Sequence, residues 1–334
     1  MQLSEDELVA AIARLLSGEA PGVVVGFGDD AAVVEPGPGH AILTADLLVE
    51  GVHFDRGSIS AHDLGAKAIA VNVSDVAAMG GSPRFALVSI ALPGDVEAPW
   101  VMELYGGMRD ACGEYALTLV GGDTNRADLL VVSVAVTGEV TPGGAIRRSG
   151  AQPGDLIVVT GSLGVAAGGL VLSRADPARA AAALSHPWGR ELVDALSRPV
   201  ARVGEGQRLA QSGVTAMMDL SDGLAMDLPR LCRESGVGAR LDLSSVPIAE
   251  ALRSAASVLE VDALELAVSG GEDYELLATI DATHLELARR ELDERFGVPL
   301  TEIGVIVDRG LVVVDAEGNE SPLEPRGWDH FARG

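Results

Sequence analysis

The spacing of apolar positions predicts both helices and strands along the chain. Leu8, Ile12 and Leu15 recur on one face of a helix near the N-terminus. Residues 61–79 form a long run rich in Ala and Val, which predicts a helix that is apolar on nearly all sides and therefore buried.

Short apolar runs bounded by turn residues predict the strands. These runs are residues 23–25, 41–45, 85–92, 116–120, 130–140, 156–160, 214–218, 240–243, 274–280, 302–307 and 311–314. Helical patterns lie between most of the runs, so the expected fold class is α/β (α+β), without strict alternation of strand and helix. The turn-rich segment 148–155 separates two strand runs and predicts a boundary between domains 1–148 and 149–334.

The charge of the chain limits its partners. The 334 residues carry a net charge of −25, which excludes nucleic acid binding through a basic surface. An acidic chain binds polyphosphates only where divalent cations or local arginines reverse the field.

The location of the protein is predicted from several simple features. Cys112 and Cys232 lie far apart in apolar surroundings and are expected to be buried free thiols. No apolar run approaches the length needed to cross a membrane. Glu5, Asp6 and Glu7 occupy the place of the basic start of a signal peptide, so we expect a cytoplasmic protein that binds no membrane.

Aspartates recur where predicted strands or glycine turns end, at Asp30, Asp46, Asp123, Asp219 and Asp222. Loops at strand ends often carry functional sites, and Mg²⁺ prefers a few carboxylates together with phosphate oxygens. Each aspartate could instead cap a helix or form an Asx turn, as Asp222 could before a helix that begins at Gly223. The pattern leaves a metal site and a structural role equally open.

Asp75 interrupts the apolar helix predicted over residues 61–79. Asn72 and Asp75 are three residues apart and therefore share one face of that helix. A buried carboxylate requires a hydrogen-bonding partner or a metal ion. A structural hydrogen bond and a metal ligand are both compatible with this pattern.

The common phosphate-binding motifs are absent from the sequence, which has no GxxxxGK[ST] loop, no protein-kinase HRD or DFG arrangement and no Rossmann fingerprint. Weaker candidates remain. His53 lies in a polar turn, Arg148 could meet phosphate or solvent, and Trp328 could stack on a ligand ring or fix the tail. Paired glycines in the segment 269–273 would allow a ligand to approach the backbone, but they also serve any tight turn.

A series of segments resembles the thiamine-monophosphate kinase family. The segments are Gly26-Phe27-Gly28-Asp29-Asp30, Thr44-Ala45-Asp46, Glu50-Gly51-Val52-His53-Phe54, Asn72-Val73-Ser74-Asp75, Gly121-Gly122-Asp123-Thr124, Arg148-Ser149-Gly150, Asp219-Leu220-Ser221-Asp222-Gly223, Ser269-Gly270-Gly271-Glu272-Asp273-Tyr274-Glu275-Leu276 and Trp328-Asp329-His330-Phe331. The helix that carries Asp75 and the Gly-Gly-Asp segment are shared with the wider aminoimidazole-ribotide synthetase superfamily. Segments 50–54 and 269–276 make the resemblance specific to the kinases.

The resemblance implies a two-domain fold of the aminoimidazole-ribotide synthetase type. An N-terminal domain would bind ATP and Mg²⁺ and would form a homodimer in which the N-terminal sheets join into a barrel. A C-terminal α/β domain would complete the cleft for ATP and several Mg²⁺ ions.

The resemblance also assigns roles to individual residues. The implied metal ligands are Asp30, Thr44, Ala45, Asp46, Asp75, Asp123, Asp219 and Asp222. Tyr105, Gly122, Asp123, Arg148 and Ser221 would contact the nucleotide, and His53, Glu272 and Trp328 would line the thiamine-phosphate pocket. Family members usually carry Ser or Thr where this chain has Ala45, so only a backbone carbonyl could serve as a metal ligand there.

The implied activity is the ATP-dependent phosphorylation of thiamine monophosphate to thiamine diphosphate by direct in-line transfer. The acceptor is already an ionised phosphate, so no catalytic base is expected; metal ions and positioning would promote the reaction. Two alternatives remain, another enzyme of the superfamily and a non-catalytic nucleotide-binding sensor. Formation of ADP that depends on thiamine monophosphate discriminates the kinase from the sensor.

Overall fold

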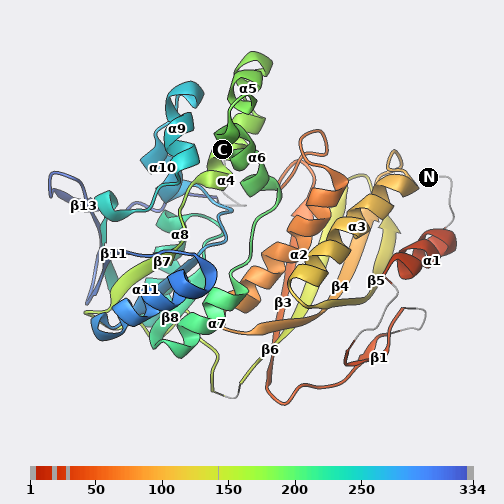
Figure 1. Cartoon of the computed structure of the whole chain (residues 1–334), viewed down its shortest axis with the longest axis horizontal. Helices are drawn as coiled ribbons and strands as arrows, with labels where there is room; N and C mark the ends of the chain where they lie inside the picture. Colours follow the sequence, from red (N-terminus) through yellow and green to blue (C-terminus); the bar gives the residue numbers. More distant parts are fainter. Residues whose placement is uncertain (1–4, 17–20, 28–30, 142, 329–334) are drawn as a thin grey trace. The chain divides into compact units, whose positions relative to one another are not determined.

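A computed structural model describes residues 5–16, 21–27, 31–141 and 143–328 of the chain (Figure 1). The chain divides into two compact units. The first comprises Met1–Val76 and Gly81–Gly143, and the second comprises Ala77–Gly80 and Gly144–Gly334. Asp30 and residues 329–334 lie outside the described residues.

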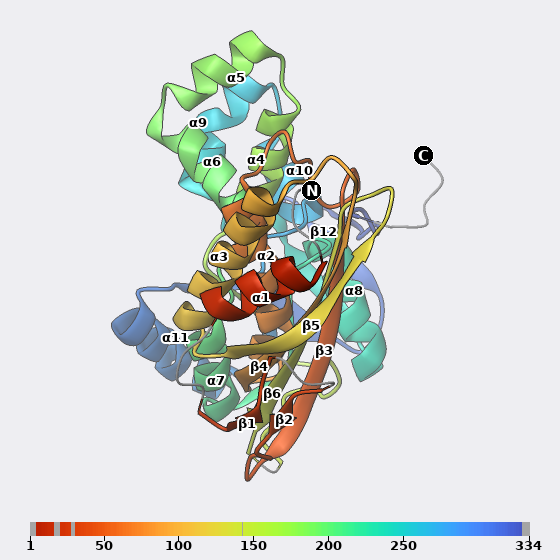
Figure 2. The same ribbon diagram turned by 90° about the vertical axis from the view of Figure 1, so that its right-hand side faces the viewer.

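The first unit is built on a mixed sheet with the strand order β3-β6-β4-β5. The strands are β3 (His40–Val49), β4 (Ser82–Leu92), β5 (Thr118–Arg126) and β6 (Val131–Val140). Helices α2 (Ala61–Ala78) and α3 (Ala98–Glu114) cover one face of this sheet, and α1 (Glu5–Leu15) packs beside α3 (Figures 1 and 2). A small antiparallel pair, β1 (Val23–Val25) and β2 (Val33–Val34), completes the unit.

Side chains along β3 point alternately to the outer face and to the helix-covered face of the sheet. Leu43 and Leu47 are 75% and 51% exposed, whereas Leu48 is buried. Thr44 and Asp46 lie on the same face as Leu48, because side chains of a strand alternate. On the neighbouring strand β4, Leu87 is 46% exposed on the outer face. The sheet therefore has one face packed on helices and one apolar face that stays open in the single chain.

The predicted long helix is confirmed as α2. Nearly every side chain from Leu64 to Ala78 is buried, including Lys67, the only lysine of the chain, which is 1% exposed. Asp75 is the single partly exposed position between Leu64 and Ala78. Its place on the helix therefore differs from the full burial that the sequence suggested.

The second unit contains a larger sheet with the strand order β13-β12-β9-β11-β7-β10-β8. The strands are β7 (Leu156–Thr160), β8 (Val214–Asp219), β9 (Gly238–Asp242), β10 (Leu276–Ile280), β11 (Leu300–Val307), β12 (Leu311–Val314) and β13 (Glu320–Pro322). Alternate residues of the interior strand β7 enter different cores: Ile157 and Val159 belong to one buried cluster, and Val158 belongs to another. Both faces of this sheet are therefore covered.

Helices supply those two cores and a third one. Helices α8 (Leu224–Ser235) and α10 (Ala263–Ser269) contribute to the first core, and α7 (Val203–Gln211) and α11 (Ala282–Phe296) contribute to the second. A separate cluster joins α4 (Val165–Ser173), α5 (Pro177–Leu184), α6 (Pro187–Ser197) and α9 (Glu250–Leu259). A short 3₁₀ helix, η1, spans Leu243–Ser245. In the described part of the chain, no helix combines the length and apolar character that a membrane span requires.

The mixed α/β fold class is confirmed, and so are the predicted free cysteines. Cys112 and Cys232 are buried and unpaired, and burial raises the pKa of their thiols to about 12 and about 11. Two strand-end predictions were wrong. Asp46 lies inside β3, and Gly121-Gly122-Asp123 lies inside β5 instead of forming a turn.

Candidate active site

In the first unit, β3 and α2 bring together three residues that the sequence proposed as metal ligands. The Thr44 Oγ1 hydroxyl donates a hydrogen bond to Asp75 Oδ2 at 2.5 Å, and the backbone N–H of Asp46 donates to Asn72 Oδ1 at 2.9 Å. Asn72 is itself fixed by donating from Nδ2 to the Ala68 carbonyl. Asn72 and Asp75 therefore both connect the same face of α2 to the edge strand β3.

Ala45 does not join this cluster through its side chain. It lies between Thr44 and Asp46 on β3, so its methyl group points to the opposite, exposed face of the sheet. A hydroxyl side chain at this position would also point there. Only backbone atoms of Ala45 remain available on the Asp75 side.

His53 lies in the turn that follows β3. Its Nδ1 accepts a hydrogen bond from the Val49 N–H at 3.0 Å, so the ring proton resides on Nε2 in the neutral form. The neighbouring Glu50 forms an ion pair with Arg56 at 2.5 Å. These contacts hold the turn that was predicted to face the substrate.

Tyr105, Gly122 and Asp123 lie together at the other edge of the sheet. Burial raises the pKa of Tyr105 above its usual value, and the charge of Asp123 adds to the effect. A Cβ on Gly122 would lie 1.8 Å from the Val88 carbonyl oxygen, so glycine is required by the close approach of β4. The Asp123 carboxylate is exposed and accepts a hydrogen bond from Asn125 at 2.6 Å.

Asp123 is separated from the Asp75 cluster within the unit. The pairing of the strands places Leu47, Ser133, Ser89 and Asp123 in one row across the sheet, and the Asp123 carboxylate at the β5 edge lies near Tyr105 of the covering helix α3. Strands β3 and β5 are three positions apart in the sheet, which corresponds to about 14 Å at the usual spacing. One metal ion cannot contact Asp46 and Asp123 of the same unit.

In the second unit, two loops and the C-terminal segment bring five predicted residues together. Asp219 ends β8 and is followed by Ser221 and Asp222, whose loop lies against the segment before β10. The Glu272 N–H donates to the Ser221 carbonyl at 2.8 Å, and the Trp328 N–H donates to the Asp222 carbonyl at 3.3 Å. The side chain of Trp328 is 42% exposed. Residues predicted to bind metal, nucleotide and substrate therefore lie on backbone segments that are hydrogen-bonded to one another.

A buried carboxylate that the sequence did not reveal fixes the Asp222 loop. Asp227 Oδ2 accepts hydrogen bonds from the N–H groups of Ser221 and Asp222 at 3.1 and 3.0 Å. Arg230 Nη1 bridges Asp222 Oδ2 at 2.5 Å and Asp227 Oδ1 at 2.7 Å. Burial is the main cause that raises the pKa of Asp227 to about 6. The spacing of Asp227 and Arg230 on one helix face was the available signal.

Arg148 lies apart from this group. Its carbonyl accepts a hydrogen bond from Ser235 Oγ at the C-terminal end of α8, whereas Asp222 precedes the N-terminal end. A helix of this length, 12 residues, separates its ends by about 18 Å. The exposed side chain of Arg148 is not brought to Asp222, and its contact with the nucleotide stays a prediction.

The candidate metal ligands provide hard oxygen donors, but they do not form a complete cage. Among the described residues, no three His, Cys, Asp or Glu side chains are close enough to form a ready metal site. Asp30, another predicted ligand, lies outside those residues. Mg²⁺ commonly uses one or two carboxylates plus water and substrate phosphates, so an incomplete carboxylate set is suited to a metal that arrives with a nucleotide.

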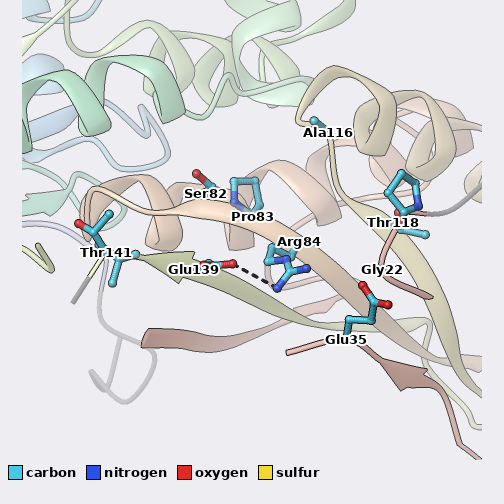
Figure 3. Close-up of a pocket in the computed structure, with 11 residues that line it drawn as sticks. Gly22, Glu35, Ser82, Pro83, Arg84, Ala116, Thr118, Glu139 and Thr141 are labelled. Carbon is cyan, nitrogen blue, oxygen red and sulfur yellow. Dashed lines mark hydrogen bonds and ion pairs between the residues drawn. The ribbon is translucent and has the colours of Figure 1, made fainter. Parts of the chain in front are cut away.

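A pocket of about 610 Å³ lies elsewhere in the first unit (Figure 3). Arg84 and Glu139, which form an ion pair at 3.1 Å, line it together with Glu35 and Thr118. None of its lining residues is a predicted site residue, so the pocket does not coincide with the candidate active site.

Comparison with family models covers most of the chain. Residues 28–140 match the AIR synthase related protein, N-terminal domain, and residues 152–317 match the corresponding C-terminal domain. The thiamine-monophosphate kinase of Escherichia coli K12 is 37% identical over 338 residues, covering 99% of each chain. The thiamine-monophosphate kinase of Bacillus subtilis strain 168 is 36% identical over 315 residues, covering 92% of this chain and 94% of the relative.

Solved structures give the same relationship. Thiamine-monophosphate kinase from Stenotrophomonas maltophilia K279a matches with a TM-score of 0.79 and 35% identity, covering 96% of this chain and 99% of that chain. AaThiL complexed with AMPPCP and TMP matches with a TM-score of 0.75 and 34% identity, covering 99% of both. E. coli HypE, a hydrogenase maturation protein, has a TM-score of 0.79 at 19% identity over 98% of this chain and 99% of its own, a likeness of fold alone.

Proposed function

Because the chain belongs to the thiamine-monophosphate kinase family within the AIR synthase related proteins, we infer that it phosphorylates thiamine monophosphate with ATP to give thiamine diphosphate and ADP. A relative of 34% identity is complexed with AMPPCP, an ATP analogue, and TMP, which correspond to a phosphoryl donor and this acceptor.

The observation in this chain that best supports the proposal is the joining of two loops in the second unit. One loop carries Ser221 and Asp222, assigned to nucleotide and metal, and the other carries Glu272, assigned to the acceptor. A direct hydrogen bond from the Glu272 N–H to the Ser221 carbonyl connects them. A phosphoryl transfer site requires this adjacency, because donor and acceptor must be held in line.

We propose that Mg²⁺ binds with the nucleotide, and the donor set fits this ion. Thr44 and Asp75 place a hydroxyl and a carboxylate within hydrogen-bond distance, and Asp46 follows on the same face of β3. Asp219 and Asp222 supply carboxylates in the second unit, and Asp30 is the remaining predicted ligand. Bound Mg²⁺ would neutralise phosphate charge that the acidic chain otherwise repels.

The residues of the chain would act by binding and orientation. A terminal phosphate oxygen of thiamine monophosphate attacks the γ-phosphorus of ATP, the bond to the β,γ-bridging oxygen breaks, and ADP leaves with that electron pair. His53 would offer Nε2 to the acceptor, because its Nδ1 accepts the Val49 N–H. Glu272 and Trp328 line the acceptor side. No side chain is needed as a base, because the attacking oxygen is already ionised.

The test is mass detection of thiamine diphosphate after incubation of the purified protein with ATP, Mg²⁺ and thiamine monophosphate. One ADP is expected for each thiamine diphosphate, with neither product when the acceptor or Mg²⁺ is omitted. Free thiamine serves as the second acceptor. Binding of both ligands without turnover would reject the kinase and select the nucleotide-binding sensor.

We further propose that the protein is a cytoplasmic homodimer. Its use of ATP and its two unpaired buried thiols support the location. The apolar outer face of the first-unit sheet, with Leu43, Leu47 and Leu87, supports association through this face. The residues assigned to metal on β3 would remain on the opposite, helix-covered side.

A homodimer would also account for Asp123. If the two sheets close into a barrel with β3 of one copy beside β5 of the other, Asp123 of the second copy approaches β3 from the neighbouring edge. This arrangement overcomes the separation between Asp123 and Asp46 within one unit. Each active site would then contain Asp75 from one copy and Asp123 from the other.

Mixed dimers test this sharing of residues. A dimer of one Asp75→Asn chain and one Asp123→Asn chain, isolated with two affinity tags, would contain one site with both changes and one intact site. About half of wild-type turnover is expected, although each homodimeric variant is inactive. A mixed dimer as inactive as its parents would place Asp75 and Asp123 in the same subunit's site.

A further inference from the structure

The loop that carries Glu272 has an unusual backbone. Glu272 and Tyr274 adopt φ angles of +69° and +50°, in the left-handed region that residues with side chains rarely occupy. Such conformations persist only where surrounding contacts hold them, and they gather at functional sites. Asp273 lies between the two strained residues.

Asp273 connects this loop to the start of α4. Its Oδ2 accepts a hydrogen bond from the Gly164 N–H at 2.7 Å, and its Oδ1 accepts a longer one from the Ala166 N–H at 3.5 Å. These amides lack partners within the helix, and the helix dipole favours a negative charge near them. Burial raises the pKa of Asp273 to about 7, with the Glu275 carboxylate adding to this effect.

A second connection holds the loop where it enters β10. Glu275 is 5% exposed, and both of its carboxylate oxygens accept hydrogen bonds from Arg202, at 2.8 and 2.5 Å. Thr160 donates to the same carboxylate at 2.6 Å. The strained Tyr274 therefore lies between two anchored carboxylates.

The neighbouring loop with Ser221 and Asp222 has its own anchor. Asp227 accepts the N–H groups of both residues and is paired with Arg230. Asp273 binds amides at the start of α4, whereas Asp227 and Arg230 belong to α8. The nucleotide loop and the acceptor loop thus touch each other but are fixed by different carboxylates.

We propose that Asp273 is a positioning residue for the acceptor, which holds the Glu272 backbone in its left-handed conformation by binding the first amides of α4. The Glu272 carboxylate would then face the cationic, phosphorylated heteroaromatic acceptor. This inference rests on the proposed function, because the acceptor role of Glu272 follows from family membership. In this proposal Asp273 affects acceptor binding, and Asp227 holds the loop that carries Ser221 and Asp222.

The consequence is a split in Michaelis constants. In Asp273→Ala both contacts to α4 are lost, and Glu272 relaxes from its bound position. KM for thiamine monophosphate is expected to rise about tenfold or more, while KM for ATP changes less than about twofold. In Asp273→Asn one acceptor oxygen remains, so the same split is expected with a rise of about threefold or more in the acceptor KM.

Asp281→Ala is the matched control. Asp281 caps α11 of the same unit by accepting the Thr283 N–H at 2.8 Å and the Thr283 hydroxyl at 2.5 Å, so these contacts are local to its own helix. The Asp281→Ala variant should lose a comparable contact at a helix N-terminus, and both of its KM values should remain unchanged. Thermal unfolding of all variants establishes the folded fraction, and if the Ala variant does not fold, the Asn variant provides the measurement.

The outcomes separate the two proposals. A wild-type protein that forms no thiamine diphosphate would remove the proposed function itself. If the wild-type protein is active, the positioning role is rejected when the folded variant keeps its acceptor KM within about twofold of wild type, or when both KM values rise equally. A selective rise of the acceptor KM, absent from Asp281→Ala, supports it.

Discussion

The Thr44 hydroxyl donates to the Asp75 carboxylate at 2.5 Å, which connects an edge strand to the last turns of the buried helix α2. This contact settles the geometry of Asp75 that its helical position left open. The carboxylate faces the strand that also carries Asp46. A hydroxyl and two carboxylates on adjoining elements form the oxygen-rich surface that the proposed Mg²⁺ ions require.

Asp75→Asn is expected to lower kcat by about 100-fold or more, because the amide keeps the hydrogen bond from Thr44 but removes a charge that binds the cation. The melting temperature should stay close to that of the wild type, since the size and the acceptor oxygen are retained. Steady-state formation of thiamine diphosphate measures the effect. Near-normal turnover would discard Asp75 as a metal ligand.

Trp328→Ala is expected to raise KM for thiamine monophosphate by about tenfold, because a stacking surface for a heteroaromatic ring is lost. The backbone bond from Trp328 to Asp222 is unaffected by this change. Trp328→Phe retains a ring and should remain within about threefold of the wild type. An unchanged KM in the Ala variant would reduce Trp328 to a residue that fixes the tail.

Leu47→Glu combined with Leu87→Glu is expected to convert the dimer into monomers. Burying two unpaired carboxylates from each chain in the interface should raise the dissociation constant by about 100-fold or more. Leu287→Glu is the control, since Leu287 is 44% exposed on α11 of the second unit and lies outside the proposed interface. Sedimentation velocity over a concentration series gives the result, and an unshifted dimer in the double variant contradicts association through this face.

The raised pKa of Asp273 predicts a pH dependence of stability. This carboxyl has an ordinary pKa of 3.8 and a folded-state pKa of about 7, so between these values the folded state binds more protons than the unfolded state. The contribution of Asp273 to the free energy of unfolding is therefore greatest below about pH 4 and is lost as the pH rises towards 7. Asp227 contributes in the same direction up to about pH 6.

Urea unfolding of the wild type and Asp273→Asn at pH 5, 6 and 7 measures this contribution. The amide does not titrate, so the free energy of unfolding of the variant should improve relative to the wild type as the pH rises. A difference that stays constant across this range would show that the Asp273 carboxyl does not titrate between pH 5 and 7.

The sequence was most informative where burial follows a simple period. The helix over residues 61–79 and the strand runs of both units were predictable because apolar side chains must be covered. The strands β2 (Val33–Val34) and β13 (Glu320–Pro322) were missed, because two or three residues are too few to show a period. Pairing with a neighbour defines them instead.

Glycine gave the main misleading signal in the first unit. Gly121-Gly122 was interpreted as a turn, whereas both residues lie inside β5. Gly122 is required there by the carbonyl of Val88 on the adjacent strand, a tertiary contact that local sequence does not display. Asp46 was likewise placed after a strand, although β3 continues to Val49.

The candidate site was predictable in its residue types but not in its supporting contacts. Asp75 was singled out by its apolar helix, whereas the roles of Thr44, Ser221 and Glu272 came from the family resemblance. Asp227 and Asp273 were not assigned roles, because each acts on backbone amides that lie earlier in the chain, a few residues before Asp227 and far before Asp273. Only folding brings those amides to the carboxylates.

The alternation of β3 restricts how this gene can vary in length. Thr44 and Asp46 face α2, whereas Leu43 and Leu47 face outward, so insertion or deletion of one codon before Thr44 would exchange the two sets of side chains. Leucines would then replace the oxygen donors beside Asp75, and an aspartate would enter the apolar surface. Related sequences should therefore tolerate substitutions in β3 far better than the insertion or deletion of a single residue there.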